Sequence, residues 1–360
     1  MSLAPDVLIV GAGPAGIATA LALHRAGFAV AVTDCACPPV DKVCGEGLLP
    51  DSIAALNELG VTIPVGVGFG FRGVRFIDGE LSATADFTRG TGIGLRRTVL
   101  HALLIEHALK AGISFAWGQR GTRLAKQGVL FNGEIVRPKL VVGADGQNSK
   151  IRKDAGFGRA RREARRFGFR RHYKIAPWSA YAELHWGQRC QLYVTPVSES
   201  EVGIAFLSRN SKLRLRDALA DFPAVRERLG RAHACSAEAG GVTVSRRLDR
   251  VCSDRVALVG DASGSVDAIT AEGMGLSFRQ AIALSHAFKS GDLSEYERAH
   301  RALRRRPAFM ESAMLTLARH DALRRRALAL LARYPELFAR ILAIHVGAAS
   351  LGDPVIRAAA

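Results

Sequence analysis

The 360-residue chain lacks several common features, and each absence argues against one class of protein. No stretch of about 18 apolar residues is free of charge, which argues against a membrane span. The opening MSLAPDVLIVG has neither the basic start nor the small-residue cleavage site of a signal peptide. Only six cysteines are present, and without an export signal reduced thiols are the default. We therefore expect a cytoplasmic protein with no disulfide-linked partner.

Acidic residues are also scarce, with 33 Asp and Glu against 50 Lys and Arg, which gives a net charge of +17. Much of the excess lies in the segment 159–174 and in the triplets 304–306 and 324–326. Such charge usually forms a solvated face, but it also attracts anionic membrane surfaces or acidic carrier proteins. Because no zinc-finger spacing or RNA-binding signature accompanies it, we expect no nucleic-acid partner.

The order of apolar runs and glycines predicts the fold. Residues 6–10 and 28–34 read as strands around a helix at 17–27, which is a β-α-β unit. An alternating segment at 165–208, with a turn at 198–200, reads as antiparallel strands. Further elements are expected as helices at 52–59, 97–112 and 275–288, as buried strands at 139–146 and 255–263, and as a basic helical tail from 295.

These elements predict an α/β protein with three parts. A discontinuous Rossmann-type cofactor domain is expected to carry an inserted antiparallel-sheet substrate domain and a helical C-terminal tail. The predicted ranges are 1–60, 96–160 and 250–295 for the cofactor domain, 61–95 and 161–249 for the substrate domain, and 296–360 for the basic helical region.

A glycine-rich turn follows the first strand. Gly11, Gly13 and Gly16 have the G-x-G-x-x-G spacing between a strand and a helix, and Asp34 ends the next strand. Such glycines allow a tight turn and close approach to a pyrophosphate, which the helix N-terminus binds. The acidic residue suits ribose hydroxyls. This pattern predicts dinucleotide binding but does not separate FAD from NAD.

Two later segments point to a flavin. VVGADGQNSKIR covers residues 141–152, and VALVGDASGSVDAITAEGMGLSFRQA covers 256–281. Asp261 follows a strand and can aim its carboxylate at a ribityl chain, while the helix that starts in AEGMGLSF can turn its N–H groups to the flavin N1/C2=O edge. The alternative is that Asp145 and Asp261 only cap turns.

Together the three segments resemble the para-hydroxybenzoate hydroxylase-type FAD-dependent oxidoreductases, whose dinucleotide, DG and GD motifs occur in the same order across residues 6 to about 290. The resemblance implies FAD as cofactor and NAD(P)H as co-substrate, with no separate nicotinamide domain. The implied cofactor-binding residues are Gly11, Gly13, Ala15, Gly16, Asp34, Cys35, Lys42, Gly45, Arg97, Asp145, Asp261, Gly273, Met274 and Gly275.

The stretch DKVCGEGLLP, residues 41–50, resembles the P-C-G-G loop of geranylgeranyl reductase-like enzymes and the G-E-S-L-L-P of flavin-dependent halogenases. The resemblance implies a loop beside the isoalloxazine, where glycines let the backbone approach. Cys44 or Glu46 would then lie at the flavin face or the substrate mouth, although a small buried thiol is the commoner role for a cysteine. The cysteines at 35, 37 and 44 fit no zinc spacing, so we expect no metal.

The family resemblance leaves the reaction open. We favour a monooxygenase that hydroxylates an aromatic or polyketide-like lipophilic substrate of secondary metabolism through a flavin C4a-hydroperoxide, with His172 acting on a phenol or enol proton. The alternatives are a geranylgeranyl reductase-like reductase of a C=C bond and a basic binding protein with structural FAD. A halogenase is disfavoured because no W-x-W-x-I-P segment is present and Arg72 stands where a lysine is needed. The amphipathic tail packs on a core or meets a membrane.

Overall fold

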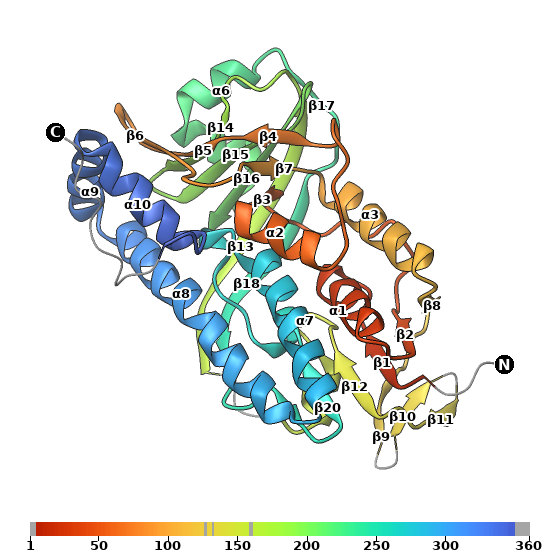
Figure 1. Cartoon of the computed structure of the whole chain (residues 1–360). Helices are drawn as coiled ribbons and strands as arrows, with labels where there is room; N and C mark the ends of the chain where they lie inside the picture. Colours follow the sequence, from red (N-terminus) through yellow and green to blue (C-terminus); the bar gives the residue numbers. More distant parts are fainter. Residues whose placement is uncertain (1–4, 126–127, 132, 158–160, 350–360) are drawn as a thin grey trace.

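The computed structural model describes residues 5–125, 128–131, 133–157 and 161–349 (Figure 1). It confirms the α/β class, with a parallel sheet, a separate mainly antiparallel sheet and a group of C-terminal helices. Arg159 and the ends of the predicted domain ranges, 1–4 and 350–360, lie outside the described residues, as do the side chains of 161–164. The domain boundaries themselves stay a prediction.

The parallel sheet has the strand order β8-β2-β1-β12-β20, with β19 added antiparallel at one edge. Its strands are β1 (Val7–Val10), β2 (Val30–Thr33), β8 (Ser114–Ala116), β12 (Leu140–Gly143), β19 (Cys252–Ser253) and β20 (Val256–Leu258). Because parallel strands end at the same edge, the segments that follow β1, β2, β12 and β20 meet there. The glycine turn, Asp34, Asp145 and Asp261 are therefore brought to one edge of this sheet.

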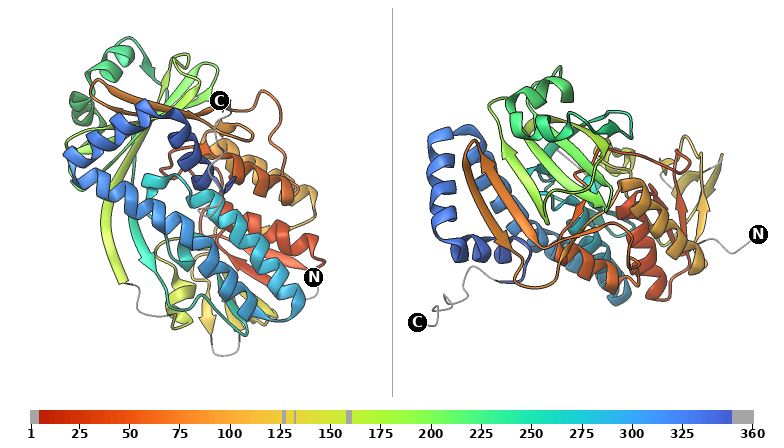
Figure 2. Two further views of the ribbon diagram at one scale, coloured as in Figure 1. Left: turned by 60° about the vertical axis from the view of Figure 1, so that its left-hand side comes forward. Right: turned by 90° about the horizontal axis from the view of Figure 1, so that it is seen from above.

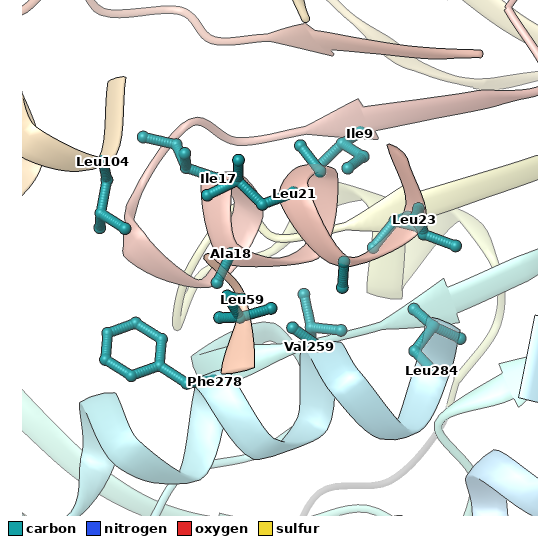
Figure 3. Close-up of a cluster of buried hydrophobic side chains, with 14 of the residues drawn as sticks. Ile9, Ile17, Ala18, Leu21, Leu23, Leu59, Leu104, Val259, Phe278 and Leu284 are labelled. Carbon is teal, nitrogen blue, oxygen red and sulfur yellow. The ribbon is translucent and has the colours of Figure 1, made fainter. Parts of the chain in front are cut away.

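Both faces of the parallel sheet are covered, which explains why its strands read as continuous apolar runs. Val7 and Ile9 point to the layer of α1 (Pro14–Arg25), α3 (Arg97–Lys110) and α7 (Gly273–Ser290), as Figure 3 shows for Ile9. Leu8 and Val10 point to the opposite core. That second core is closed by α4 (Lys150–Asp154) and by a small sheet of β9 (Arg123–Ala125), β10 (Gly128–Phe131) and β11 (Glu134–Val136).

The larger sheet has the order β17-β13-β16-β15-β14-β5-β6, and β18 pairs with β13 as well. Its strands come from both 61–95 and 161–249, and the predicted turn at 198–200 joins β15 to β16. They are β5 (Gly73–Asp78), β6 (Leu81–Asp86), β13 (Arg161–Lys174), β14 (Tyr181–Trp186), β15 (Cys190–Ser198), β16 (Glu201–Ser208), β17 (His233–Ala234) and β18 (Ala239–Arg247). A third sheet of β3 (Gly47–Leu48), β7 (Gly92–Gly94) and β4 (Phe69–Phe71) lies between the two, with α2 (Pro50–Glu58) after β3.

The two faces of the larger sheet differ in chemistry. One face is apolar and packs on α5 (Leu215–Ala218), the turn Leu219–Asp221 and α6 (Pro223–Leu229). The other face carries buried polar side chains, and it contacts the loop 41–48 and the segment 265–270. Its polar residues are Arg166, Arg170, His172, Gln191 and Thr195, with Tyr193 beside them.

The prediction of a solvated arginine face at 159–174 is wrong for part of that segment. Arg166 and Arg170 are only 3% and 2% exposed, because β13 turns every second side chain inward. Arg324 in the second triplet is also buried, and its Nε donates to Asp78 at 2.9 Å. Three arginines of these clusters are therefore buried and bonded to acidic side chains instead of facing solvent.

The C-terminal region consists of α8 (Leu293–Arg319), α9 (Asp321–Arg333) and α10 (Pro335–His345). Figure 2 shows these helices outside β5 and β6, at the side of the molecule away from the N-terminus. Phe338 and Leu342 pack there against Phe71 and Phe76. Within the described ranges, the helices are all too short or too polar to cross a bilayer.

This packing predicts the cost of truncating a core residue of α10. Phe338 is 2% exposed and its ring centroid lies 5.0 Å from that of Phe76. Phe338→Ala should lower the free energy of unfolding by about 3–5 kcal/mol, measured by urea titration. The neighbouring Leu337→Ala, at a position 38% exposed, should change it by less than about 0.5 kcal/mol. Equal effects of the two variants would contradict the placement of α10.

Candidate functional site

Some of the glycines predicted to bind the cofactor lie where other parts of the chain leave no room for a side chain. A Cβ on Gly16 would lie 1.8 Å from the carbonyl oxygen of Gly11, and one on Gly11 would lie 2.4 Å from that of Ala144. Gly260, at φ +57°, would place a Cβ 2.7 Å from the Cβ of Ala15. These contacts hold three segments directly against one another: the glycine-rich turn at 11–16, called the fingerprint below, the strand end before Asp145 and the turn before Asp261.

Other predicted glycines face open space. Among the described residues, and apart from the adjoining backbone, no atom lies within 4 Å of the place a Cβ would take on Gly13, Gly45 or Gly273. These three positions belong to the fingerprint, to the loop at residues 44–47 (the CGEG loop) and to the start of α7, which are far apart in sequence. A flavin dinucleotide requires such close backbone approach at its pyrophosphate and ring. The arrangement fits FAD on this observation.

Asp34 braces the fingerprint turn. Its carboxylate accepts hydrogen bonds from the N–H groups of Ala12 at 2.7 Å and Ala36 at 2.8 Å. Cys35 is exposed beside it, and all six cysteines of the chain have free thiols. His101 of α3, which the sequence did not suggest, contacts the Ala12 carbonyl oxygen through Nε2 at 2.7 Å. Burial lowers the pKa of His101, so its ring is neutral at physiological pH.

Asp145 and Asp261 differ in their hydrogen-bond partners and surroundings. Oδ2 of Asp145 accepts from the N–H groups of Lys150 and Ile151, so it caps α4, while its buried Oδ1 has no partner among the described residues. Asp261 stays accessible to water although surrounding protein raises its pKa by desolvation. The charge of Lys42 opposes that shift and also acts on His101, so the loop lysine lies near both groups.

The CGEG loop is fixed between β7 and the larger sheet. Glu46 adopts φ 60°, which is rare for a residue with a side chain. Its carbonyl oxygen accepts from Leu95 N–H at 2.8 Å, and Thr195 Oγ1 donates to the Gly45 carbonyl oxygen at 2.8 Å. The following β3 pairs with β7. The strained conformation thus aims the Glu46 side chain at the larger sheet.

Glu46 is the centre of a buried polar network and is only 2% exposed. Its Oε1 accepts from Arg170 Nη1 at 3.1 Å and from Arg97 N–H at 2.9 Å. Its Oε2 lies 2.6 Å from His172 Nε2. Arg170 also donates through Nη2 to Asp41 at 2.7 and 2.8 Å. The structure therefore brings two of the three predicted catalytic candidates, Glu46 and His172, into direct contact, beside an arginine that had been interpreted as surface charge.

Cys44, the third candidate, lies at the edge of this network. Its Sγ accepts from the Glu46 N–H at 3.3 Å. Burial and the negative charge of Glu46 raise the pKa of the Cys44 thiol, so it is protonated at neutral pH. Arg97 is 6% exposed, and its Nη1 has no hydrogen-bond partner among the described side chains and backbone. This buried cationic donor suits an anionic or carbonyl oxygen of a bound molecule.

The network has a route to the surface. Nδ1 of His172 lies 3.0 Å from Ser236 Oγ, and Ser236 is half-buried. Carboxylate, imidazole and hydroxyl thus form a continuous hydrogen-bonded chain from Glu46 to the protein surface. Neither Ser236 nor Asp41 was predicted from the sequence. Arg170 does carry a signal, because it alternates with Arg166 and His172 along one face of a predicted strand.

The start of α7 holds the remaining predicted residues. A Cβ on Gly275 would lie 2.1 Å from Ser52 Oγ, so α7 packs closely on α2, and Met274 packs on the main core. The residue before the helix, Glu272, is 1% exposed, with Arg306 Nε at 3.6 Å and His345 Nδ1 at 3.4 Å from its carboxylate. Burial raises the pKa of Glu272 to about 8, and the charge of Arg306 opposes the shift.

Known proteins are similar to this chain in sequence. A family model described as "FAD binding domain" matches residues 4–216. The digeranylgeranylglycerophospholipid reductase of Methanosarcina acetivorans is 28% identical over 75% of this chain and 71% of its own. The menaquinone reductase of Mycolicibacterium smegmatis is 30% identical over 43% of this chain and 41% of its own. The rifampicin monooxygenase of Streptomyces venezuelae is 32% identical over 42% and 34%.

Solved structures show the same fold. A flavoprotein/dehydrogenase from Cytophaga hutchinsonii superposes with a TM-score of 0.81 at 18% identity, over 95% of this chain and 93% of its own. A flavin-dependent brominase variant superposes with 0.78 at 18% identity, over 95% of both chains. The chain therefore belongs to the FAD-binding family of the para-hydroxybenzoate hydroxylase type. It is an FAD-dependent oxidoreductase, as the resemblance implied.

The open space at Gly13 predicts a selective loss of cofactor. Its backbone, at φ −72° and ψ 178°, accepts alanine without strain. Gly13→Ala should leave the thermal stability of the flavin-free protein unchanged but weaken FAD binding at least about tenfold, since the methyl group occupies space the pyrophosphate needs. Fluorescence titration measures this. Gly70→Ala, at another open position in β4, is the control. Unchanged FAD affinity in Gly13→Ala would argue against this cradle.

The buried Glu272 predicts a pH-dependent stability. Its pKa is about 8 in the folded chain against 4.5 as the ordinary value, so folding binds a proton between these values. The protonated Glu272 therefore contributes to the free energy of unfolding at low pH, and this contribution declines as the pH rises to about 8. Glu272→Gln should flatten that decline and raise the free energy of unfolding at pH 9 by on the order of 1–3 kcal/mol. Urea titrations at pH 6 and 9, with exposed Glu58→Gln as control, check it.

Proposed function

We propose that the protein is an FAD-dependent reductase that saturates a C=C bond of a lipophilic, isoprenoid-like substrate with NAD(P)H as reductant. One observation carries this proposal: the similarity to a digeranylgeranylglycerophospholipid reductase extends over 75% of the chain, whereas that to a rifampicin monooxygenase covers 42%. The residues alone favour a monooxygenase, and the length of the reductase alignment reverses that order.

The geometry supports a proton donor for such a reduction. Bound flavin, once reduced by NAD(P)H, would supply the hydride for one alkene carbon and return to its oxidised form. The other carbon must receive a proton, and the protonated Cys44 thiol in the CGEG loop can hold it at Sγ. The chain Ser236–His172–Glu46 offers protons a path from the surface to a carboxylate whose charge acts on this thiol. Two hydrogens are thus added, one as hydride and one as a proton.

A monooxygenase is the second candidate, and a specific observation favours it. The buried pair of Glu46 Oε2 and His172 Nε2, 2.6 Å apart, is suited to accepting a phenol proton and passing it to Ser236. Halogenation has less support, because the brominase likeness concerns the fold alone and Arg72 is engaged with Asp86 at 2.8 Å.

Anaerobic reduction separates the two candidates. The protein is reduced with NADPH or NADH in a sealed cuvette and then mixed with a polyprenyl lipid without oxygen. A reductase reoxidises its flavin under these conditions, and the lipid gains two hydrogens by mass spectrometry. A monooxygenase stays reduced until air is admitted, and its product then takes up label from ¹⁸O₂. The second pattern would overturn the reductase proposal.

The role of the thiol can be tested by substitution. Cys44→Ser should slow lipid-dependent flavin reoxidation by about 10²-fold or more, because a serine hydroxyl is a far weaker acid than a thiol. Flavin content and the rate of reduction by NAD(P)H should not change. Cys37→Ser, at an exposed thiol, should behave as wild type. If Cys44→Ser reoxidises at the wild-type rate, Cys44 does not supply the proton.

A further inference from the structure

The C-terminal helices expose an unusual number of large apolar side chains. Ten such residues are exposed in the described part of the chain, and five of them lie between positions 309 and 337, at 38–55% exposure. We call the outer side of α9 and the adjoining end of α10 the tail face. It comprises Leu323, Leu330, Tyr334 and Leu337 with Arg319, Arg325, Arg326 and Arg333, while the fifth apolar residue, Phe309, lies on α8.

The tail face is organised along α9. Leu323 and Leu330 are seven residues apart, about two turns of a helix, and therefore lie on the same side. Arg326 and Arg333 have the same spacing on the adjacent strip. These two strips lie away from Leu328 and Leu331, which are buried. The helix thus has a buried side and a second, solvent-facing side in which apolar and cationic strips run in parallel.

The fold does not account for this outer side. The buried side already anchors α9 through Leu331 in the core with β5 and β6 and through Arg324, which bonds to Asp78 at 2.9 Å and Asp321 at 2.8 Å. The right-hand view of Figure 2 shows α9 and α10 at the margin of the molecule, and no other helix or strand of the described residues lies outside them there. The anchoring interactions use neither Leu323 nor Leu330.

The charge of the tail face is strongly one-sided. No acidic group in the described residues forms an ion pair with Arg319, Arg325, Arg326 or Arg333. Of the two exposed acids nearby, Asp321 is bonded to Arg324, which leaves Glu336. The Arg333 guanidinium lies 5.6 Å from the ring centroid of Tyr334, which keeps cation and aromatic ring together at the surface.

We propose that the tail face docks on a membrane surface that contains anionic lipids. Leucine and tyrosine side chains on a helix parallel to the surface enter the boundary between headgroups and acyl chains, while arginines beside them bind lipid phosphates. The leucine strip supplies the apolar contact, and the arginine strip together with the net charge of +17 supplies the electrostatic attraction. Nucleic acid would use the arginines but leave Leu323 and Leu330 exposed, so a lipid surface accounts for more of the face. This docking is independent of which flavin reaction occurs.

Co-sedimentation of the full, FAD-loaded chain with vesicles tests the proposal. We expect binding to mixed phosphatidylcholine–phosphatidylglycerol vesicles and little binding to phosphatidylcholine alone. Arg325→Glu/Arg326→Glu should weaken binding at least about tenfold. The control pair Arg209→Glu/Arg226→Glu, exposed elsewhere, lowers the net charge equally, by 4, from +17 to +13, and should bind as wild type.

The apolar strip has its own test. Leu323→Ser/Leu330→Ser should lower vesicle binding even at high salt, where the electrostatic attraction is screened. Leu109→Ser/Ile135→Ser, at positions 56% and 49% exposed, should not. Circular dichroism and flavin content verify that each variant is folded. Failure of the wild type to bind mixed vesicles, or equal loss in the control pairs, overturns the proposal. So would binding to heparin or an acidic carrier protein through the tail face without vesicle binding.

Discussion

The buried ion pair between Glu46 and Arg170 is the interaction on which the candidate site depends. Burying two charges is costly unless each is paired and hydrogen-bonded, and removing one partner strands the other. Here Arg97 N–H, His172 and Asp41 supply the additional bonds, and both side chains are at most 2% exposed. The pair fixes the CGEG loop against the larger sheet and so sets the space between the cofactor motifs and the polar face of that sheet.

The same kind of contact recurs where the larger sheet meets α8 and the segment before α7. Arg166 donates to Asp267 at 3.0 Å, next to the segment that leads into α7, and Ser245 bonds to Glu311 of α8. The larger sheet keeps its apolar face for α5 and α6 and turns polar groups to the cofactor domain. A polar boundary of this type is rigid when its groups are satisfied, yet it leaves donors and acceptors next to the cofactor.

The sequence predicted what depends on local patterns. The β-α-β unit, the fingerprint and the DG and GD turns follow from apolar runs and glycine spacing, and parallel strand ends bring them to one edge. It could not predict the partners of Glu46, because Arg170 and His172 are 124 and 126 residues away. It also missed the inward direction of Arg166 and Arg170. A shift of one residue in a strand reverses its faces, and tertiary packing fixes that choice.

The C-terminal helices also contact the segment that leads into α7. His345 of α10 lies beside Glu272, the residue before α7, and its Nε2 contacts the Thr270 carbonyl oxygen at 3.1 Å. Burial lowers the pKa of His345 to about 4, so a neutral imidazole and a mostly protonated carboxyl meet at physiological pH. Such a neutral contact avoids the cost of buried charge. The inner side of the C-terminal helices therefore supports the start of α7 through His345 of α10. The outer side, on α9, presents arginine and leucine to solvent. Packing on α7 thus determines the residues of the buried side but not those of the exposed side.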